Sequence, residues 1–299
     1  MYILFALLTF ACWGVADLFY KKGNVTKSKY DHLKTGVMVG VVMGLHATIY
    51  MIANGLTLNF IDMLKYLPVS LLYISSMVIG YRGLKYLEVS LSSPIQNTSG
   101  VITSLLLVIF FKEELPIPAY LAFGLIFAGI LVLSLIEYNS YKKERNELKK
   151  NMVKKKIVFL TILFPIFYCI LDGLGTFIDS IYLDKLELIG DDSALLCYEY
   201  TFFIYAIITY IYLRYKKENI SINTEKDKLI AAVMETAGQF FYVFAMAENS
   251  TISASIVGSY CILSFLLGSL VLKEKLEKKQ YVGIALAIIG IVILAILDI

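Results

Sequence analysis

Ten long apolar stretches, separated by short charged segments, limit the fold of this chain more than any other feature of its sequence. A helix that crosses the hydrocarbon layer of a membrane needs about 20 largely apolar residues, since it rises about 1.5 Å per residue across roughly 30 Å. Ten segments meet this requirement and predict ten membrane-spanning helices. Their predicted ranges are 2–20, 36–53, 67–87, 90–111, 117–136, 157–183, 194–213, 229–247, 251–272 and 280–297.

The composition excludes the soluble classes of protein. Hydrophobic residues make up 59% of the chain and charged residues only 17%, whereas soluble domains average about 25% charged residues. The charges are also concentrated in the connections, and only seven lie inside the predicted spans. This distribution does not fit a soluble enzyme, a nucleic-acid-binding protein or a disordered chain. We therefore expect an all-α membrane protein that binds no nucleic acid.

The sequence contains no motif typical of an enzyme or of a cofactor site. We find no phosphate-binding glycine loop, no His-Glu-x-x-His and no Gly-x-Ser-x-Gly, so neither catalysis nor ATP-driven pumping is expected. The four cysteines lie singly in separate predicted spans, without metal-ligand spacing. We therefore expect no cofactor, no metal and no disulfide.

Lys and Arg are divided unequally between two sets of connections. Counted from the N-terminus, the odd-numbered connections and their adjoining helix ends hold 24 of them, and the even-numbered ones hold 3. Cytoplasmic connections of membrane proteins are enriched in Lys and Arg. The count therefore favours cytoplasmic odd connections and both termini outside.

The two halves of the chain are similar to each other. Residues 92–135 align without a gap with residues 253–296, and the charged pattern Lys-Glu-x-Leu recurs at the same place in both. Five predicted spans fall in each half, and an odd number inverts the second half relative to the first. We predict a 5+5 inverted repeat, with a first repeat at 1–137, a basic linker at 138–156 and a second repeat at 157–299.

A second alignment relates the first and sixth spans. It places Trp13 and Asp17 on Tyr168 and Asp172, so that each span has an aromatic residue four positions before a carboxylate. Inverted repeats of this kind bind their substrates near the middle of the membrane, between the two copies. These four residues are therefore candidates for a central binding site.

The duplication and one glycine pattern resemble the drug/metabolite transporter (DMT) superfamily, in particular its EamA-like branch. The pattern is a Glu followed by two glycines across the fourth and fifth spans of each half. It is complete as Glu274, Gly283 and Gly290, and partly kept as Glu113, Ala122 and Gly129. The resemblance implies a ten-helix transporter whose first, third, fourth, sixth, eighth and ninth helices line a central cavity. It also implies cytoplasmic termini, against the Lys and Arg count.

Charged residues inside spans are the strongest candidates for function, because each costs about 2.5 to 3.5 kcal/mol at the centre of a helix in lipid. Asp172 and Glu235 lie well inside their spans and are the first candidates for binding substrate or protons. Asp17, Asp179 and Glu199 come next. Arg82 lies near the end of its span, where its side chain can instead reach the interface.

Uncharged polar and aromatic residues supply further candidates for contact with a substrate. Asn97, Gln96 and Tyr260 lie in the fourth and ninth spans, and Gln239 and Tyr242 continue the helical face of Glu235. Trp13, Tyr168 and Tyr242 have rings that can hold a cation. The alternative role for these polar groups is hydrogen bonding between packed helices.

The sequence as a whole indicates a multi-pass secondary transporter of the plasma membrane. We expect an exporter or proton-coupled carrier of small polar or amine-bearing metabolites, such as amino acids, that works by alternating access of its two halves. Its partners would be a small-molecule substrate, lipid and protons, and it would be a monomer or homodimer. The alternatives are efflux of hydrophobic or quaternary cations, and a membrane scaffold that transports nothing.

Overall fold

A computed structural model describes residues 1–24, 28–87, 89–112, 114–147, 152–221, 225–272 and 278–297, and every element in these ranges is helical. The elements are α1 (Tyr2–Asn24), α2 (Asp31–Ala53), α3 (Phe60–Gly83), α4 (Val89–Phe111), α5 (Ile117–Glu147), α6 (Met152–Ser180), a π-helical turn η1 (Ile181–Lys185), α7 (Asp191–Tyr215), α8 (Lys226–Val257), α9 (Cys261–Leu272) and α10 (Lys278–Leu297). The expectation of an all-α membrane protein is thus met.

Several helices begin or end outside the apolar stretches that predicted them. Helix α3 begins at Phe60, well before the predicted start at residue 67, because the side chain of Asn59 caps it by accepting a hydrogen bond from the Ile61 backbone N–H at 2.9 Å. Helix α5 continues to Glu147 and α6 begins at Met152. The described part of the predicted basic linker at 138–156 is therefore helical. Residues 148–151 lie outside the described part.

The predicted span 251–272 is not one continuous helix. Helix α8 runs on to Val257 through a kink at Asn249, whose backbone leaves the helical region at φ −158° and ψ 92°. The Asn249 side chain accepts a hydrogen bond from the Ile252 N–H at 3.1 Å and so starts a second helical section. A turn then separates this section from α9. The family-type glutamates Glu113 and Glu274 lie outside the described residues.

Eight helices in the described ranges are long and apolar enough to cross a membrane. They are α1, α2, α3, α7, α8 and α10, with residues Ile117–Ile136 of α5 and Leu163–Lys185 of α6 and η1. The fourth and ninth predicted spans contribute shorter apolar helices, Ile95–Phe111 and Cys261–Val271. The chain is therefore an integral membrane protein, and the count of ten crossings stays a prediction.

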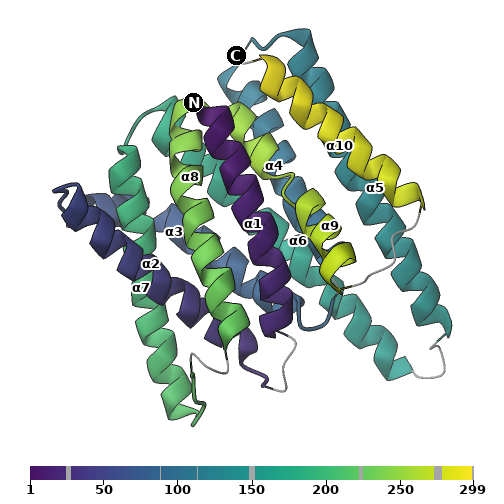
Figure 1. Cartoon of the computed structure of the whole chain (residues 1–299), viewed down its shortest axis with the longest axis horizontal. Helices are drawn as coiled ribbons and strands as arrows, with labels where there is room; N and C mark the ends of the chain where they lie inside the picture. Colours follow the sequence, from purple (N-terminus) through teal and green to yellow (C-terminus); the bar gives the residue numbers. More distant parts are fainter. Residues whose placement is uncertain are drawn as a thin grey trace.

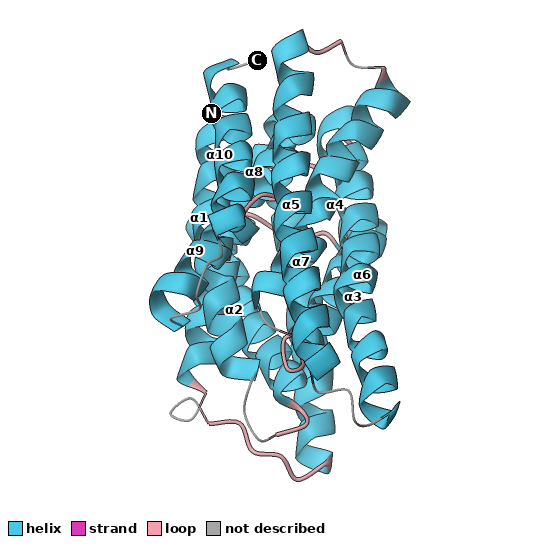
Figure 2. Cartoon of the chain, turned by 90° about the vertical axis from the view of Figure 1, so that its right-hand side faces the viewer, coloured by secondary structure: helices cyan, strands magenta, loops and turns pink. Residues whose placement is uncertain are grey.

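The helices form one bundle in which elements of the two halves alternate. Helix α1 packs along α8, α6 along α3, α2 against α7 and α5 against α10. Figure 1 shows α2 and α7 at one edge of the bundle, α5 and α10 at the other, and α1 with α8 at the front. The start of α1 and the end of α10 lie at the same end of the bundle, and Figure 2 shows the helices running lengthwise from the side.

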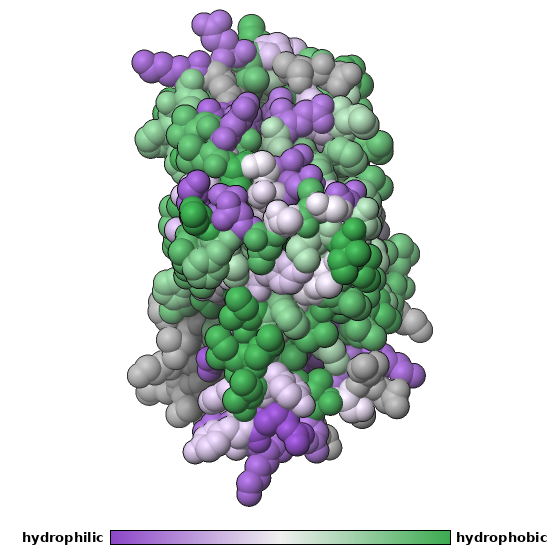
Figure 3. Space-filling view, turned by 90° about the vertical axis from the view of Figure 1, so that its left-hand side faces the viewer, coloured by the Kyte–Doolittle hydropathy of each residue, from purple (hydrophilic) through white to green (hydrophobic). Residues whose placement is uncertain are grey.

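The bundle carries apolar side chains outside and many polar ones inside. Exposed residues on α2, α7 and α10 include Val41, Leu45, Ile49, Ile204, Ile208, Ile211, Val282, Ile289 and Val292. Figure 3, a view from the α2 and α7 side, shows hydrophobic residues over much of the middle of this face, with hydrophilic ones at both ends and extending from the upper end toward the middle. This arrangement suits a lipid environment, in which polar groups are stabilised by facing the bundle interior.

Close backbone packing at Gly100 leads to a testable prediction about stability. A Cβ atom built there would lie 2.4 Å from the carbonyl oxygen of Ala254 and 2.7 Å from the Cα atom of Gly258. Because both are backbone atoms, no side-chain rotation relieves the clash, and we expect Gly100→Ala to cost about 1 to 3 kcal/mol.

The matched control is Gly124→Ala, which lies on helix α5 with nothing within 4 Å of the added carbon. Removing a helix glycine there is expected to be neutral or to stabilise by up to about 1 kcal/mol. Thermal unfolding in detergent micelles measures both variants. Equal melting temperatures for the two would contradict the packing that the structure gives for Gly100.

Candidate functional site

A central cavity lies between helices of both halves. About 820 Å³ of space, open solvent at its mouth included, lies between α1, α3, α4, α6, α8, one residue of α7 and the turn before α9. Its walls are formed by Trp13, Asp17, Tyr20, Tyr73, Met77, Gly80, Tyr81, Leu84, Gln96, Asn97, Ser99, Gly100, Tyr168, Asp172, Thr176, Tyr198, Glu235, Gln239, Tyr242, Ala254, Val257, Gly258 and Tyr260. Of the helices expected from the family resemblance to line a cavity, the first, third, fourth, sixth and eighth do so, whereas the ninth predicted span contributes the end of α8 and the turn before α9.

Three carboxylates reach this cavity, and no basic side chain is found among its described wall residues. Asp17 comes from α1, Asp172 from α6 and Glu235 from α8. Among the residues that the structure describes, no Lys, Arg or His side chain lies within ion-pair distance of any of the three. The cavity is therefore acidic and suited to a positively charged ligand.

Helix α4 supplies a hydroxyl group to each of the two aspartates. The Ser93 hydroxyl donates to Asp17 Oδ2 at 2.5 Å, and the Ser99 hydroxyl donates to Asp172 Oδ2 at 2.7 Å. These neutral donors orient the carboxylates without cancelling their charge. Asp17 and Asp172 correspond to each other in the sequence alignment of the halves.

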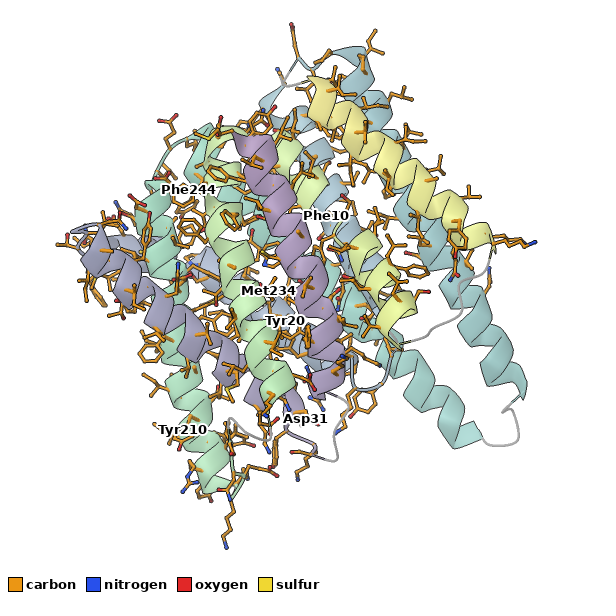
Figure 4. All side chains as sticks on the ribbon, in the orientation of Figure 1. Phe10, Tyr20, Asp31, Tyr210, Met234 and Phe244 are labelled. Atoms are coloured by element: carbon orange, nitrogen blue, oxygen red, sulfur yellow. The ribbon has the colours of Figure 1, made fainter. Side chains whose placement is uncertain are left out.

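Glu235 is held by a chain of two tyrosines. The Tyr81 hydroxyl donates to that of Tyr20 at 3.0 Å, and the Tyr20 hydroxyl donates to Glu235 Oε2 at 3.0 Å. Figure 4 shows Tyr20 where the lower part of α1 lies against α8. Both tyrosines are buried, so this carboxylate too receives only neutral hydrogen bonds in the described part of the protein.

Aromatic rings make up much of the remaining wall. The Trp13 ring lies 5.2 Å from the Tyr242 ring and 5.8 Å from the Tyr260 ring, between centroids, and its Nε1 donates to the Glu235 carbonyl oxygen at 3.3 Å. Tyr20, Tyr73, Tyr81, Tyr168 and Tyr198 also line the cavity. Aromatic faces attract cations, most strongly where water is excluded.

The aromatic residues at aligned positions of α1 and α6 each rest on a glycine of the opposite half, on α8 and α3 respectively. A Cβ atom at Gly238 would lie 2.4 Å from Trp13 Cδ1, and one at Gly80 would lie 2.7 Å from Tyr168 Cδ2. Each glycine thus leaves the space that the ring of the opposite half occupies. The two halves build matching parts of the wall in the same way.

The predicted polar contacts Gln96, Asn97 and Gln239 also line the cavity and are buried. The Asn97 amide donates to the Ser93 carbonyl oxygen at 2.8 Å. Gln96 Nε2 is different, since it is buried with no hydrogen-bond partner among the described residues. An unpartnered donor in a cavity wall is available to a ligand or to water.

Three predicted site residues do not line the cavity. Asp179 is buried behind it, where the hydroxyl of Tyr66 donates to its Oδ1 atom. Glu199 is paired with His46, whose Nδ1 atom lies 2.8 Å from Oε2. Arg82 is exposed and lies over the ring of Phe164, with its Cζ atom 5.8 Å from the centroid.

Sequence reasoning missed six polar residues of the wall: Tyr20, Tyr73, Tyr81, Ser99, Thr176 and Tyr198. A signal was present on α3, where Tyr73, Met77, Gly80, Tyr81 and Leu84 recur at helical spacing along one face. Tyrosine is frequent at membrane interfaces, however. This row of residues on α3 therefore cannot be told apart from interface anchors until the packing of α3 against the other helices is known.

A buried ionic cluster lies between the cavity and one end of the bundle. The Lys228 ammonium, which is 1% exposed, lies 3.3 Å from Asp31 Oδ1 and also pairs with Glu225. Lys34 pairs with Glu218 at 2.9 Å, and this ion pair lowers the pKa of the Glu218 carboxyl group. Figure 4 shows Asp31 at the end of the bundle opposite to the start of α1.

The same end carries a direct connection from α1 to the segment after α3. The Lys21 ammonium donates to the carbonyl oxygens of Leu84, at 3.0 Å, and of Leu87, at 2.6 Å. Leu84 lines the cavity. The cluster joins α2 to α8 and to the segment before it, and so connects the two halves on this side of the cavity. The Lys21 connection stays within the first half.

Comparisons with known proteins identify a transporter family and a similar fold. The sequence model of the EamA-like transporter family matches residues 1–135 and 187–296. A solved structure described as "Crystal structure of protein" is 12% identical, has a TM-score of 0.66 and is similar over 98% of this chain and 96% of its own. At that identity the likeness concerns the fold alone. No curated protein matches the chain.

Proposed function

Because this chain belongs to the EamA-like transporter family, we propose that it is a secondary carrier of small cationic or amine-bearing metabolites. The cargo would include basic amino acids and amines. The protein would work by alternating access, in which two inverted five-helix halves expose the central cavity to each side of the membrane in turn.

One observation carries this proposal: three carboxylates share a cavity whose described wall residues include no basic side chain. Leaving such charges without a counterion in a poorly solvated site is costly, and a bound cation removes that cost. Serine and tyrosine donors orient the carboxylates. A positively charged amine would therefore receive both charge and directed hydrogen-bond acceptors.

The packing of the helices supports the inverted halves, 1–137 and 157–299. In such a repeat each helix of the first half has a counterpart in the second, from α1 and α6 to α5 and α10. Exchanging counterparts turns the pair of α1 and α8 into the pair of α6 and α3. It likewise turns the pair of α1 and α9 into the pair of α6 and α4. All four of these pairs are in contact, and the pairs α2 with α7 and α5 with α10 map onto themselves. The contact pattern of the bundle is thus close to symmetric.

The ionic cluster supports alternating access. It joins the halves at one end through buried charges, and we propose that these paired charges close that side of the cavity. A carrier must separate such contacts to open that side. We propose that the cluster opens in the conformation that exposes the cavity at this end.

We also propose a place in the plasma membrane with both termini outside. The excess of Lys and Arg in the odd-numbered connections supports this orientation. Protons are the coupling ion that we propose, because carboxyl groups are the ionisable groups of the cavity. A single bundle contains the whole cavity, so the proposal works for a monomer and for a dimer.

A second candidate function is efflux of hydrophobic or quaternary cations. Trp13 and seven tyrosines line the cavity, and aromatic faces hold quaternary ammonium groups without hydrogen bonds. The directed carboxylates favour a primary amine instead, because its N–H groups can use the acceptors. A membrane scaffold without transport activity would bind neither class.

Ligand-dependent thermal stabilisation tests the proposal. A ligand that binds only the folded state at 100 times its Kd stabilises it by about 2.7 kcal/mol. We expect lysine or putrescine to raise the melting temperature of the purified protein in detergent, and glucose and citrate to leave it unchanged. Tetraethylammonium and tetraphenylphosphonium represent the second candidate function.

Uptake of the stabilising cation into proteoliposomes then separates a carrier from a protein that only binds. A protein that none of the four cations stabilises, or that citrate stabilises, would contradict the proposed substrate class. Stabilisation without uptake would contradict the proposed carrier.

A further inference from the structure

The geometry points to Asp179 as a proton-binding site separate from the substrate carboxylates, connected to the cavity by the hydroxyl groups of Tyr73 and Tyr242. This inference deepens the proposed carrier and rests on it for its role in transport. Its structural part concerns one buried carboxyl group and two hydroxyl groups, and it can be tested without a substrate.

Asp179 is enclosed by tyrosines. Its side chain is 0% exposed and does not line the cavity. The Tyr66 hydroxyl donates to Oδ1, and the Tyr73 hydroxyl lies 3.4 Å from Oδ2. Among the described residues no Lys, Arg or His side chain lies within ion-pair distance of this carboxyl group. Its charge is therefore uncompensated whenever it is ionised.

The groups around Asp179 suit a proton better than another cation. From α3 it faces Tyr66 and Tyr73, from α8 it faces Tyr242, and Tyr198 of α7 packs against Tyr73 with ring centroids 5.9 Å apart. These hydroxyl groups direct their hydrogens at the carboxylate, so they do not supply the oxygen ligands that a metal ion would need there. Asp179 itself does not line the cavity that would hold a metabolite, whereas Tyr73 and Tyr242 do.

A short hydrogen-bonded route joins Asp179 to the cavity. The Tyr73 hydroxyl oxygen lies 2.6 Å from that of Tyr242 and 3.2 Å from Thr176 Oγ1. Tyr73, Tyr242 and Thr176 all line the cavity, whereas Tyr66 does not. Of the three tyrosines around Asp179 in the described structure, Tyr73 and Tyr242 thus also reach the cavity wall, and Tyr66 does not.

The proposed step moves one proton and conserves every hydroxyl group. The protonated Asp179 carboxyl gives its proton to the Tyr73 oxygen, while Tyr73 passes its own hydrogen to the Tyr242 oxygen. Tyr242 releases its hydrogen to water in the cavity. The carboxyl group becomes a carboxylate, and both tyrosines keep one hydrogen each. Rotation of the two hydroxyl groups restores the starting arrangement.

This route would couple a proton to the substrate. Asp172 lies seven residues before Asp179 on α6, which is about 10 Å along a helix. A cation bound beside Asp172 favours the ionised form of a carboxyl group at that distance. Cation entry and proton release would then accompany each other, as exchange transport requires.

Infrared spectroscopy of the purified protein in detergent tests the site without any ligand. We expect a band from a protonated carboxyl group that Asp179→Asn removes. In heavy water this band shifts as the proton exchanges for deuterium. Tyr73→Phe and Tyr242→Phe each break the route, and we expect them to slow the exchange at least tenfold while keeping the band.

Tyr66→Phe is the matched control, since it removes a hydroxyl group from the same carboxyl group on the side that does not reach the cavity. We expect exchange within about twofold of the unaltered protein. If Asp179→Asn does not fold, Asp179→Glu keeps a carboxyl group and is expected to shift the band.

An unchanged carboxyl band in Asp179→Asn, or unaltered exchange in both Tyr73→Phe and Tyr242→Phe, would overturn the inference. These readouts need no substrate, so they remain decisive even if the cation panel shows that the proposed substrate class is wrong. Conversely, if a cation stabilises the protein but the carboxyl band is absent, the inference about Asp179 fails and the proposed substrate class stands.

Discussion

Replacing Glu235 by Gln is expected to weaken binding of a cationic substrate by roughly 30-fold or more. Removing one member of a buried charge pair costs about 2 to 5 kcal/mol, and each 1.4 kcal/mol is tenfold in affinity. Glu235 is buried, lines the cavity and accepts a hydrogen bond from Tyr20. The substitution removes the charge and leaves the shape of the side chain almost unchanged.

Thermal stabilisation by putrescine or lysine, titrated over the ligand concentration, measures the change in affinity. Glu248→Gln is the matched control, because Glu248 is 46% exposed, pairs with the N-terminal ammonium and lies outside the cavity. We expect this control to bind as the unaltered protein does. Equal cation affinities of Glu235→Gln and Glu248→Gln would show that Glu235 does not bind the substrate, and would contradict a binding site made of all three carboxylates.

The buried charge of Glu235 also leads to a prediction about the thermal stability of the protein without ligand. In the absence of ligand, Glu235→Gln removes a buried charge without a counterion, so the variant is expected to unfold at the same or a higher temperature than the unaltered protein. A loss of binding together with a lower melting temperature would instead point to a structural role. The two measurements together therefore separate substrate binding from packing.

Replacing Lys228 by Met is expected to destabilise the protein by about 3 to 5 kcal/mol, the cost of breaking a buried ion pair from one side. Lys228 is 1% exposed and pairs with both Asp31 and Glu225. Methionine fills a similar volume, so most of the loss would come from carboxylates that remain buried without this ammonium group. Thermal unfolding in detergent measures the effect.

Lys65→Met is the matched control for this prediction. Lys65 is 54% exposed and pairs with Asp62 three residues earlier on the same helix, and exposed pairs contribute about 0 to 1 kcal/mol. Lys228→Arg keeps the charge and is expected to recover part of the stability. Similar melting temperatures for Lys228→Met and Lys65→Met would show that the ionic cluster does not hold the two halves together.

Much of the fold could be predicted because hydrophobicity acts locally. A stretch of about 20 apolar residues identifies a membrane helix whatever the rest of the chain does, and every predicted span overlaps a helix of the structure. Where prediction and structure differ, the cause is a local backbone effect that hydropathy does not register. The cap at Asn59 and the kink at Asn249 are examples.

The candidate site could be predicted only in part. Charge inside a span marked Asp17, Asp172 and Glu235, and all three line one cavity. The same criterion marked Asp179, Glu199 and Arg82, which lie elsewhere. Asp172 and Asp179 share one helical face, and only the position of the tyrosines of α3 and α8 separates a cavity residue from an enclosed one.

The sequence by itself determined that the chain lies in a membrane, that its halves are similar, and which charged residues are exceptional for lipid. These properties depend on neighbouring residues and on the cost of moving each group out of water. Only the tertiary structure decided which of those residues meet. Asp17 and Glu235 come together because α1 packs along α8, and such contacts arise from the shapes of surfaces far apart in the sequence, which no local pattern encodes.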